Sequence, residues 1–244
     1  PIFFMWETDL WSTLKNRFFD MVSQEPRATA GVGEWFKKQW DRRLERLLAQ
    51  PGTMIWGEMK QNAEAISSSA QRGAPLLYDA ATRSSSSDAK RDRLHFIGHS
   101  AGSIVVSHAV DRLAKLGWKF DSVNFMAPAV TVDLFNKTLL PSLKGGQVKR
   151  LHEFHLTDLA EQEDTTCRPV LGYGRSLLYL VSESFERGVR TPILGMDKYF
   201  DESLRKMSNV KVFAGPGGQT KCSSHGGFDN DPVTRDNIVK LIRS

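Results

Sequence analysis

The stretch from Arg93 to Val106 constrains the fold of this chain more than any other stretch. The short apolar segment Leu94–Ile97 is followed by Gly-His-Ser-Ala-Gly at positions 98–102 and then by a helix-forming sequence. Because glycine has no Cβ atom, glycines on both sides of a serine let the chain reverse sharply where strand and helix would otherwise collide. The stretch therefore predicts a strand, a tight turn and a helix in direct succession.

Strand-like apolar segments and helix-forming segments alternate from this turn to the end of the chain. Further strands are predicted at Phe120–Met126, Leu151–Leu156 and Val210–Ala214, and helices at Ala101–Leu116, Val132–Leu143, Ser176–Glu186 and Pro232–Ile242. Such alternation predicts an α/β fold with a mostly parallel sheet and helices on both of its faces. A length of 244 residues fits one domain with a sizeable core, which we expect to span residues 1–244.

A long stretch before the turn has one apolar and one basic face. Residues Gly31–Gln50 place aromatic and leucine side chains on one side and lysines and arginines on the other, which predicts an amphipathic helix. Pro51 and Gly52 are expected to end this helix, and Thr53 is expected to cap a second one. Residues 31–87 are therefore a candidate helical cap or lid region.

Composition excludes several classes of protein. Lys and Arg number 33 and Asp and Glu number 28, which leaves a formal net charge of +5. This excess is small and scattered, so no nucleic-acid partner is expected. The apolar runs are far shorter than the roughly 20 residues that cross a bilayer, so no transmembrane segment is predicted. The 2 cysteines are too few for a disulfide scaffold or for a zinc site of their own.

The turn at 98–102 has the pattern G-x-S-x-G, in which the serine hydroxyl stands exposed on a strained strand-to-helix turn. The start of the following helix adds a positive dipole, and the Ala101 N–H points to where an oxyanion would form. On these residues the segment resembles the α/β-hydrolase superfamily, particularly its esterase and lipase-like members, which often carry Gly-His-Ser-x-Gly. The resemblance covers the order of elements from about Arg93 to the end, and the earlier part only loosely.

The resemblance implies a serine hydrolase. Ser100 would attack a carboxylic ester, either a small molecule or a lipid, and form an acyl-enzyme, with Ala101 as one oxyanion donor and with no metal or organic cofactor. A lipase or phospholipase acting at an interface with a helical lid, an amidase, and a catalytically weak scaffold domain are the alternatives. Acyl length, compartment and oligomeric state do not follow from the sequence.

A serine hydroxyl needs a base within hydrogen-bond reach, and the superfamily orders its residues Ser, then Asp or Glu, then His. The chain has 6 histidines. His225 follows the last predicted strand and precedes the C-terminal helix, which is where the fold family places its base. The other histidines lie in or beside predicted strands and helices, and we interpret them as structural. The resemblance therefore implies that His225 is the base.

The resemblance expects the acid just beyond the strand at Leu151–Leu156, and Asp158 stands there. The structural alternative is helix capping, because Asp158 followed three residues later by Glu161 is also a capping-box pattern. Asp133 is the main competitor, since some lipases take their acid from the preceding strand. Asp164 and Glu161 are further candidates.

The interval between Asp158 and His225 is longer than a minimal fold of this family needs, so we expect an insertion at about residues 173–205. Cys167 follows the first of these residues and Cys222 precedes the second. A disulfide between the cysteines would tie the two loops together, and two separate thiols are the simpler alternative.

The beginning of the chain departs from the family pattern. No His-Gly motif of the kind that supplies a second oxyanion donor precedes Ser100. The first residue is Pro, and residues Pro1–Glu7 have the pattern of a buried strand, with helix-spaced apolar residues following in Leu10–Val22. We therefore expect an α/β-hydrolase fold that lacks its N-terminal strands and its oxyanion-loop motif.

Overall fold

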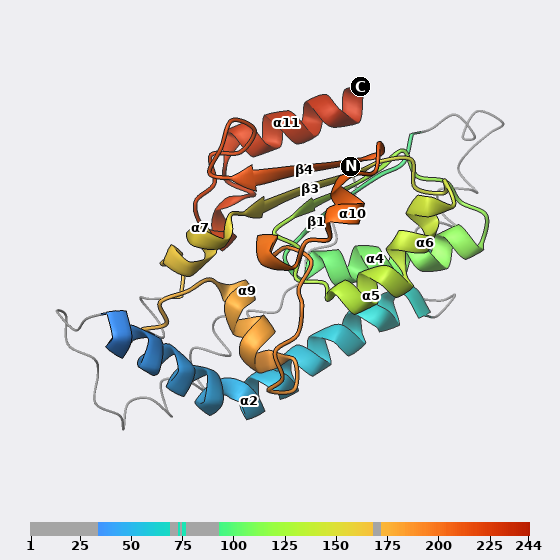
Figure 1. Cartoon of the computed structure of the whole chain (residues 1–244). Helices are drawn as coiled ribbons and strands as arrows, with labels where there is room; N and C mark the ends of the chain where they lie inside the picture. The colour runs from blue at the N-terminus through green and yellow to red at the C-terminus, as the bar shows by residue number, and fades with distance from the viewer. Residues whose placement is uncertain (1–33, 69–72, 74, 77–92, 168–171) are drawn as a thin grey trace.

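The protein is described by a computed structural model, which covers residues 34–68, 73, 75–76, 93–167 and 172–244 (Figure 1). The strand predicted at Pro1–Glu7 and the helix predicted at Leu10–Val22 lie outside these residues. Within the described part, no helix has the length and apolar character needed to span a membrane.

Four parallel strands form the sheet. They are β1 (His95–His99), β2 (Ser122–Met126), β3 (Leu151–Leu156) and β4 (Val210–Gly215), and their order in the sheet is the same as their order in the chain. Every residue of β2 and β3 is buried, as expected for central strands covered on both faces. The α/β class and the parallel sheet predicted from the alternation are confirmed, and the predicted strand at Leu151–Leu156 matches β3 residue for residue.

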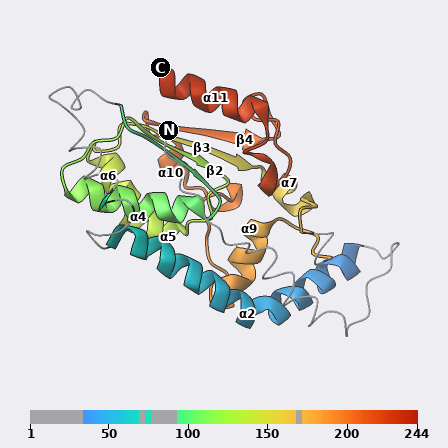
Figure 2. The same cartoon turned by 180° about the vertical axis from the view of Figure 1, so that it is seen from behind.

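The helices lie on both sides of this sheet. Figures 1 and 2 show α4, α5 and α6 on one side and α11 on the other. The helices that follow β1 are α4 (Gly102–Lys115), α5 (Val132–Lys137), α6 (Leu139–Lys144), α7 (Asp158–Glu163), α9 (Leu177–Leu180), α10 (Glu202–Arg205) and α11 (Pro232–Arg243). Three single-turn elements complete the described part, namely η2 (Val181–Phe185, a π-helix), η3 (Asp197–Tyr199) and η4 (His225–Gly227).

The single helix predicted at Val132–Leu143 is two helices in the structure. Thr138 ends α5 and begins α6, with φ −110° and ψ −70°. Its hydroxyl donates to the Leu134 carbonyl at 2.6 Å. Hydroxyl side chains that bond backbone carbonyls within a helix compete with the helical pattern, which explains the break.

The prediction that Pro51 and Gly52 end a helix is wrong. Helix α2 runs without interruption over Glu34–Ser68, with Pro51 inside it. It joins the predicted helix at Gly31–Gln50 to the one predicted to begin at Thr53.

Packing on both sides of Pro51 explains why α2 continues. Leu48 and Trp56, which flank Pro51 on the inner face, are 2% and 1% exposed. A Cβ atom on Gly52 would lie 2.2 Å from the Phe185 ring, so the glycine allows α2 to approach η2 closely. Pro51 removes one backbone hydrogen bond from the helix. The apolar face that continues through it offsets this loss, because most helix stability in proteins comes from tertiary packing.

The first half of α2 is hydrogen-bonded to the segment that follows α7. The Asp41 carboxylate accepts from the Gly174 N–H at 2.8 Å, and the Glu45 carboxylate accepts from the Tyr173 hydroxyl at 2.8 Å. The Ser184 hydroxyl donates to the Glu45 carbonyl at 2.6 Å. The described residues of the candidate cap therefore pack on the candidate insertion at 173–205, where α9 and η2 bury most of their side chains.

Candidate functional site

Ser100 lies directly after β1, at the edge of the sheet where all four parallel strands end. Its φ of 50° is in the left-handed region that few residues other than glycine adopt. Two long-range main-chain hydrogen bonds hold it there: its N–H donates to the Met126 carbonyl at 2.9 Å, and its carbonyl accepts from the Ala129 N–H at 3.0 Å. A strained residue fixed by its surroundings in this way points to a functional role.

The two glycines of the turn have different environments. A Cβ atom on Gly98 would lie 3.1 Å from the Gly102 carbonyl oxygen and equally close to backbone atoms of Ser103, so a larger residue would push β1 away from α4. A Cβ atom on Gly102 would meet no atom of the described residues within 4 Å. The close approach that the sequence pattern suggested therefore depends on Gly98.

Ser103 supports the turn from inside the protein. Its buried hydroxyl donates to the Ser100 carbonyl at 2.7 Å and accepts from the Val130 N–H at 3.0 Å. One side chain thus links the turn after β1 to the loop after β2. The sequence analysis did not identify this residue, and its position one residue beyond the motif was the only signal.

His225 contacts Ser100 although it follows β4, the strand at the opposite edge of the sheet from β1. It lies in η4, after β4, and its Nε2 is 2.8 Å from the Ser100 Oγ. The two residues that the sequence analysis named as nucleophile and base, 125 positions apart, are therefore within hydrogen-bond distance. His225 is 3% exposed, whereas Ser100 is half-buried, so the contact is open to solvent only from the side of the serine.

The environment of His225 favours its neutral form. Burial lowers the pKa of the imidazole, and the nearby His99 lowers it further, to about 3. Its Nδ1 is buried and has no hydrogen-bond partner among the described residues. A neutral imidazole with Nε2 facing a hydroxyl can accept the hydroxyl proton, and a carboxylate at Nδ1 would stabilise the resulting cation.

The candidate acids have different partners. Asp158 accepts from the Tyr179 hydroxyl at 2.7 Å and from the Gln162 amide at 2.6 Å, and it makes no hydrogen bond to His225. Thr157, not Asp158, is the N-cap of α7. Asp133 is exposed and pairs with a lysine one turn further along α5.

Asp164 is the carboxylate that contacts the histidine. It is 1% exposed, and its Oδ2 accepts from the His225 backbone N–H at 2.6 Å. Its Oδ1 accepts from the backbone N–H and the hydroxyl of Thr166. Asp164 was among the further candidates in the sequence analysis, and α7 places it six residues beyond Asp158.

Glu161 is another candidate acid in this segment, and it is buried without exposure to solvent. Burial raises its pKa to about 8, although the Ser176 hydroxyl donates to one of its oxygens. Its other oxygen has no hydrogen-bond partner in the part of the chain that the structure describes. A carboxyl group with this pKa is mostly protonated at neutral pH. It is therefore less suited than an ionised carboxylate to stabilise a charged imidazole.

Ala101 is the N-cap of α4, and its N–H makes no hydrogen bond to any described residue. It directly follows Ser100 at the start of a 14-residue helix, where the helix dipole favours negative charge. This N–H can therefore donate to an oxygen atom of a bound molecule.

The remaining histidines make contacts within the sheet and helices. His95 bonds Ser122, His152 bonds Asn124, and His155 bonds Glu153. Burial opposes the charged form of His155, but contacts to Asp197 and Glu153 outweigh this effect and raise its pKa to about 9. Burial lowers the pKa of His108 in α4. None of these four histidines bonds Ser100 in the part of the chain that the structure covers.

Both cysteines are free buried thiols. The Cys222 thiol donates to the Ser224 carbonyl at 2.9 Å. Burial raises the pKa of Cys222 to about 11 and raises that of Cys167 as well. The disulfide considered from the sequence is absent from the described residues, and neither thiol is ionised at neutral pH.

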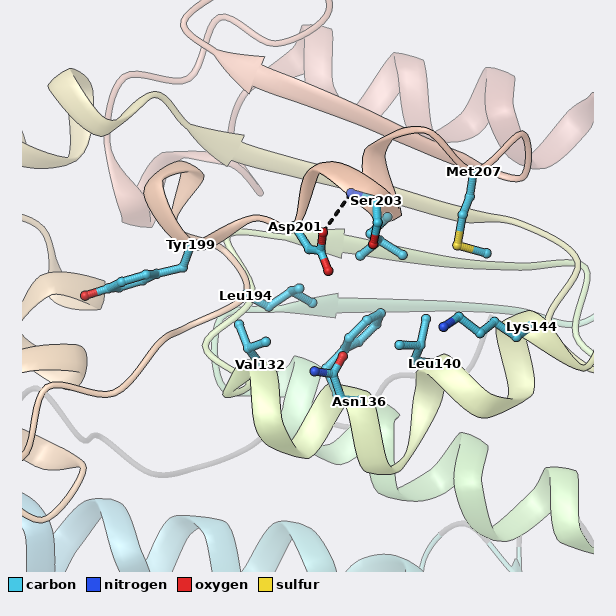
Figure 3. Close-up of a pocket in the computed structure, with 11 residues that line it drawn as sticks. Val132, Asn136, Leu140, Lys144, Leu194, Tyr199, Asp201, Ser203 and Met207 are labelled. Carbon is cyan, nitrogen blue, oxygen red and sulfur yellow. Dashed lines mark hydrogen bonds between the residues drawn. The ribbon is translucent and has the colours of Figure 1, made fainter.

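A cavity of about 130 Å³ lies between α5 and α6 on one side and residues 194–207 on the other (Figure 3). It is lined by apolar side chains such as Leu194 and by a few polar ones, including Lys144 and Asp201. Neither Ser100 nor His225 lines it. No group of histidine, cysteine or acidic residues in the described ranges is arranged to hold a metal ion.

Comparison of the chain with protein-family models, with curated proteins and with solved structures finds no match. The site is therefore interpreted from its own geometry.

Proposed function

We propose that this protein is a serine hydrolase of the α/β-hydrolase type that cleaves carboxylic esters through an acyl-enzyme. The observation that carries the proposal is the 2.8 Å contact between His225 Nε2 and the Oγ of Ser100, a residue held at a φ of 50°. The order of elements supports it, because serine, carboxylate and histidine follow β1, β3 and β4 in the sequence that the superfamily uses.

In the proposed reaction, His225 Nε2 takes the Ser100 hydroxyl proton while Oγ bonds the ester carbonyl carbon. The carbonyl oxygen becomes an oxyanion that accepts from the Ala101 N–H. The tetrahedral intermediate then breaks its bond to the alcohol oxygen, which leaves with the proton from His225. Water repeats these steps on the acyl-enzyme, releases the carboxylic acid and restores Ser100.

We propose Asp164, rather than Asp158, as the carboxylate that orients His225. Asp164 already bonds the His225 main chain, whereas Asp158 makes no hydrogen bond to His225. When Nδ1 of His225 carries a proton, we propose that the Asp164 carboxylate, which bonds the backbone N–H of the same residue, shifts to accept it. Catalytic hydrogen bonds are often long in proteins without substrate and tighten in the complex, so the unpartnered Nδ1 is compatible with this role.

Covalent labelling tests the proposal. A fluorophosphonate should phosphonylate Ser100, and peptide mapping by mass spectrometry should locate the adduct on that residue. Ser100→Ala should abolish labelling and lower kcat for p-nitrophenyl acetate by roughly 10⁴-fold or more, because residues that act together in such a site are each essential. The exposed Ser223, two residues from His225, provides the matched control, and Ser223→Ala should label as the unchanged protein does.

A folded protein that shows neither labelling nor ester hydrolysis would contradict the proposal and favour the scaffold alternative. Labelling at a serine other than Ser100 would contradict it as well.

A further inference from the structure

Both main-chain polar groups of His225, the N–H and the carbonyl, have a side chain within hydrogen-bond distance. Asp164 accepts from its N–H at 2.6 Å, and the Nε2 of His99 lies 3.1 Å from its carbonyl oxygen. The His99 and His225 rings also lie close together, with centroids 5.8 Å apart and planes inclined by 31°. Two side chains thus fix the backbone from which the imidazole projects.

The His99 contact spans the sheet. His99 is the last residue of β1, whereas His225 belongs to the loop after β4, and β2 and β3 lie between these strands. Because His99 directly precedes Ser100, the contact fixes the base relative to the same strand end that carries the nucleophile. Among the described residues, His99 and Ser100 are the side chains at the end of β1 that bond this loop, and His99 is the one that bonds its main chain.

We infer that His99 is a positioning residue, whose Nε2–H holds the His225 carbonyl so that the base stays aligned with Ser100. This inference rests on the proposed serine hydrolase function and extends it to the second residue of the Gly-His-Ser-Ala-Gly turn. A misplacement of about 1 Å in a catalytic group can cost on the order of 100-fold in rate, so a single hydrogen bond at this position has a measurable effect.

The contact also specifies which ring nitrogen of His99 carries a hydrogen. A carbonyl oxygen accepts only, so Nε2 must carry a hydrogen, and in the neutral ring Nδ1 then does not. A charged His99 would also donate, but its charge lowers the pKa of His225. Among the described residues, Asp164, from the segment after α7, is the other titratable group that bonds His225 besides the serine and His99. In either state the Nε2–H can donate to the His225 carbonyl, so the hydrogen bond and the charge are separate effects of His99.

Two substitutions separate the hydrogen bond from the charge. His99→Leu removes both, and we expect kcat for p-nitrophenyl acetate to fall roughly 10- to 100-fold with KM within about twofold. His99→Gln places an amide N–H near the position of Nε2, and we expect kcat within about threefold of the unchanged protein. In both variants the acid limb of the kcat/KM profile should move to higher pH, because the charge that lowers the His225 pKa is gone.

His95→Leu is the matched control, because His95 lies on the same strand and bonds Ser122 instead of the histidine loop. It should leave kcat and the acid limb unchanged. Urea unfolding of each variant gives the folded fraction, and kcat is expressed per folded molecule.

Equal kcat in His99→Leu and the unchanged protein, or equal loss in the Leu and Gln variants, would overturn the inference. Absence of Ser100 labelling in the unchanged protein would instead overturn the proposed function, so the two failures are distinguishable.

Discussion

The turn around Ser100 and the segment after β3 lie at the same edge of one sheet, but different interactions determine them. Ser100 is held by hydrogen bonds of its own N–H and carbonyl to the main chain at the end of β2 and just after it. The carboxyl groups after β3, at Asp158, Glu161 and Asp164, differ in burial and in side-chain partners. A turn set by backbone geometry is recognisable in the sequence, whereas the choice among similar carboxyl groups depends on what packs around each.

The largest expected effect separates the two aspartates. Asp164→Asn removes the carboxylate that bonds His225, and on the proposed function we expect kcat for p-nitrophenyl acetate to fall roughly 10³- to 10⁴-fold, as loss of the acid does in known serine hydrolase sites. Asp158→Asn leaves the His225 contacts intact, and kcat should stay within about threefold of the unchanged protein. Steady-state kinetics on folded protein measures both.

The reverse order of these effects would assign the acid to Asp158, and equal small effects would remove the acid from this segment altogether. Rates of fluorophosphonate labelling provide a second measurement, because they report the reactivity of Ser100 without the deacylation step.

The second effect concerns pH and the buried Glu161. Its pKa is about 8 in the folded protein, above its ordinary value of 4.5, so the unfolded chain loses this proton first as pH rises. Its contribution to stability is therefore complete below about pH 4.5 and is lost as pH rises through 8. Between pH 5 and 8 we expect the free energy of unfolding to fall by on the order of 2–4 kcal/mol from this group.

Urea unfolding at several pH values tests this expectation in Glu161→Gln, which lacks the titrating group. Its stability should decline less between pH 5 and 8 than that of the unchanged protein. His155, with a pKa of about 9, adds a decline above pH 6.5 in both proteins, so the difference between them isolates Glu161. The exposed neighbour Glu163 gives the control, and Glu163→Gln should follow the unchanged protein. Parallel pH curves for Glu161→Gln and the unchanged protein would show that Glu161 is ionised normally.

The smallest effect compares the two glycines of the Ser100 turn. Gly98→Ala places a Cβ atom 3.1 Å from backbone atoms, and overpacking of this kind should lower the free energy of unfolding by about 1–3 kcal/mol. Gly102→Ala meets no described atom within 4 Å, and alanine suits a helix better, so stability should stay the same or rise by up to about 1 kcal/mol. Urea unfolding distinguishes these results, and a large loss in Gly102→Ala would mean that both glycines are needed for close packing.

The sequence by itself determined the local elements. The apolar run before Gly98 and the helix former after Gly102 define β1 and α4, and Asp231 before Pro232 marks the start of α11, where its side chain accepts from two backbone N–H groups. These signals depend on residues only a few positions apart, so they can be recognised from the local sequence. The order of serine, carboxylate and histidine along the chain belongs to the same level.

Only the tertiary structure decided what depends on distant contacts. Pro51 lies inside α2 because Phe185 packs against the helix beside it. Asp164 reaches His225 because α7 turns the chain after β3, and no spacing rule separates it from Asp158. The free energies that distinguish such alternatives come from burial and hydrogen bonding between residues far apart in the chain, and the local pattern around each residue is the same whichever contact forms.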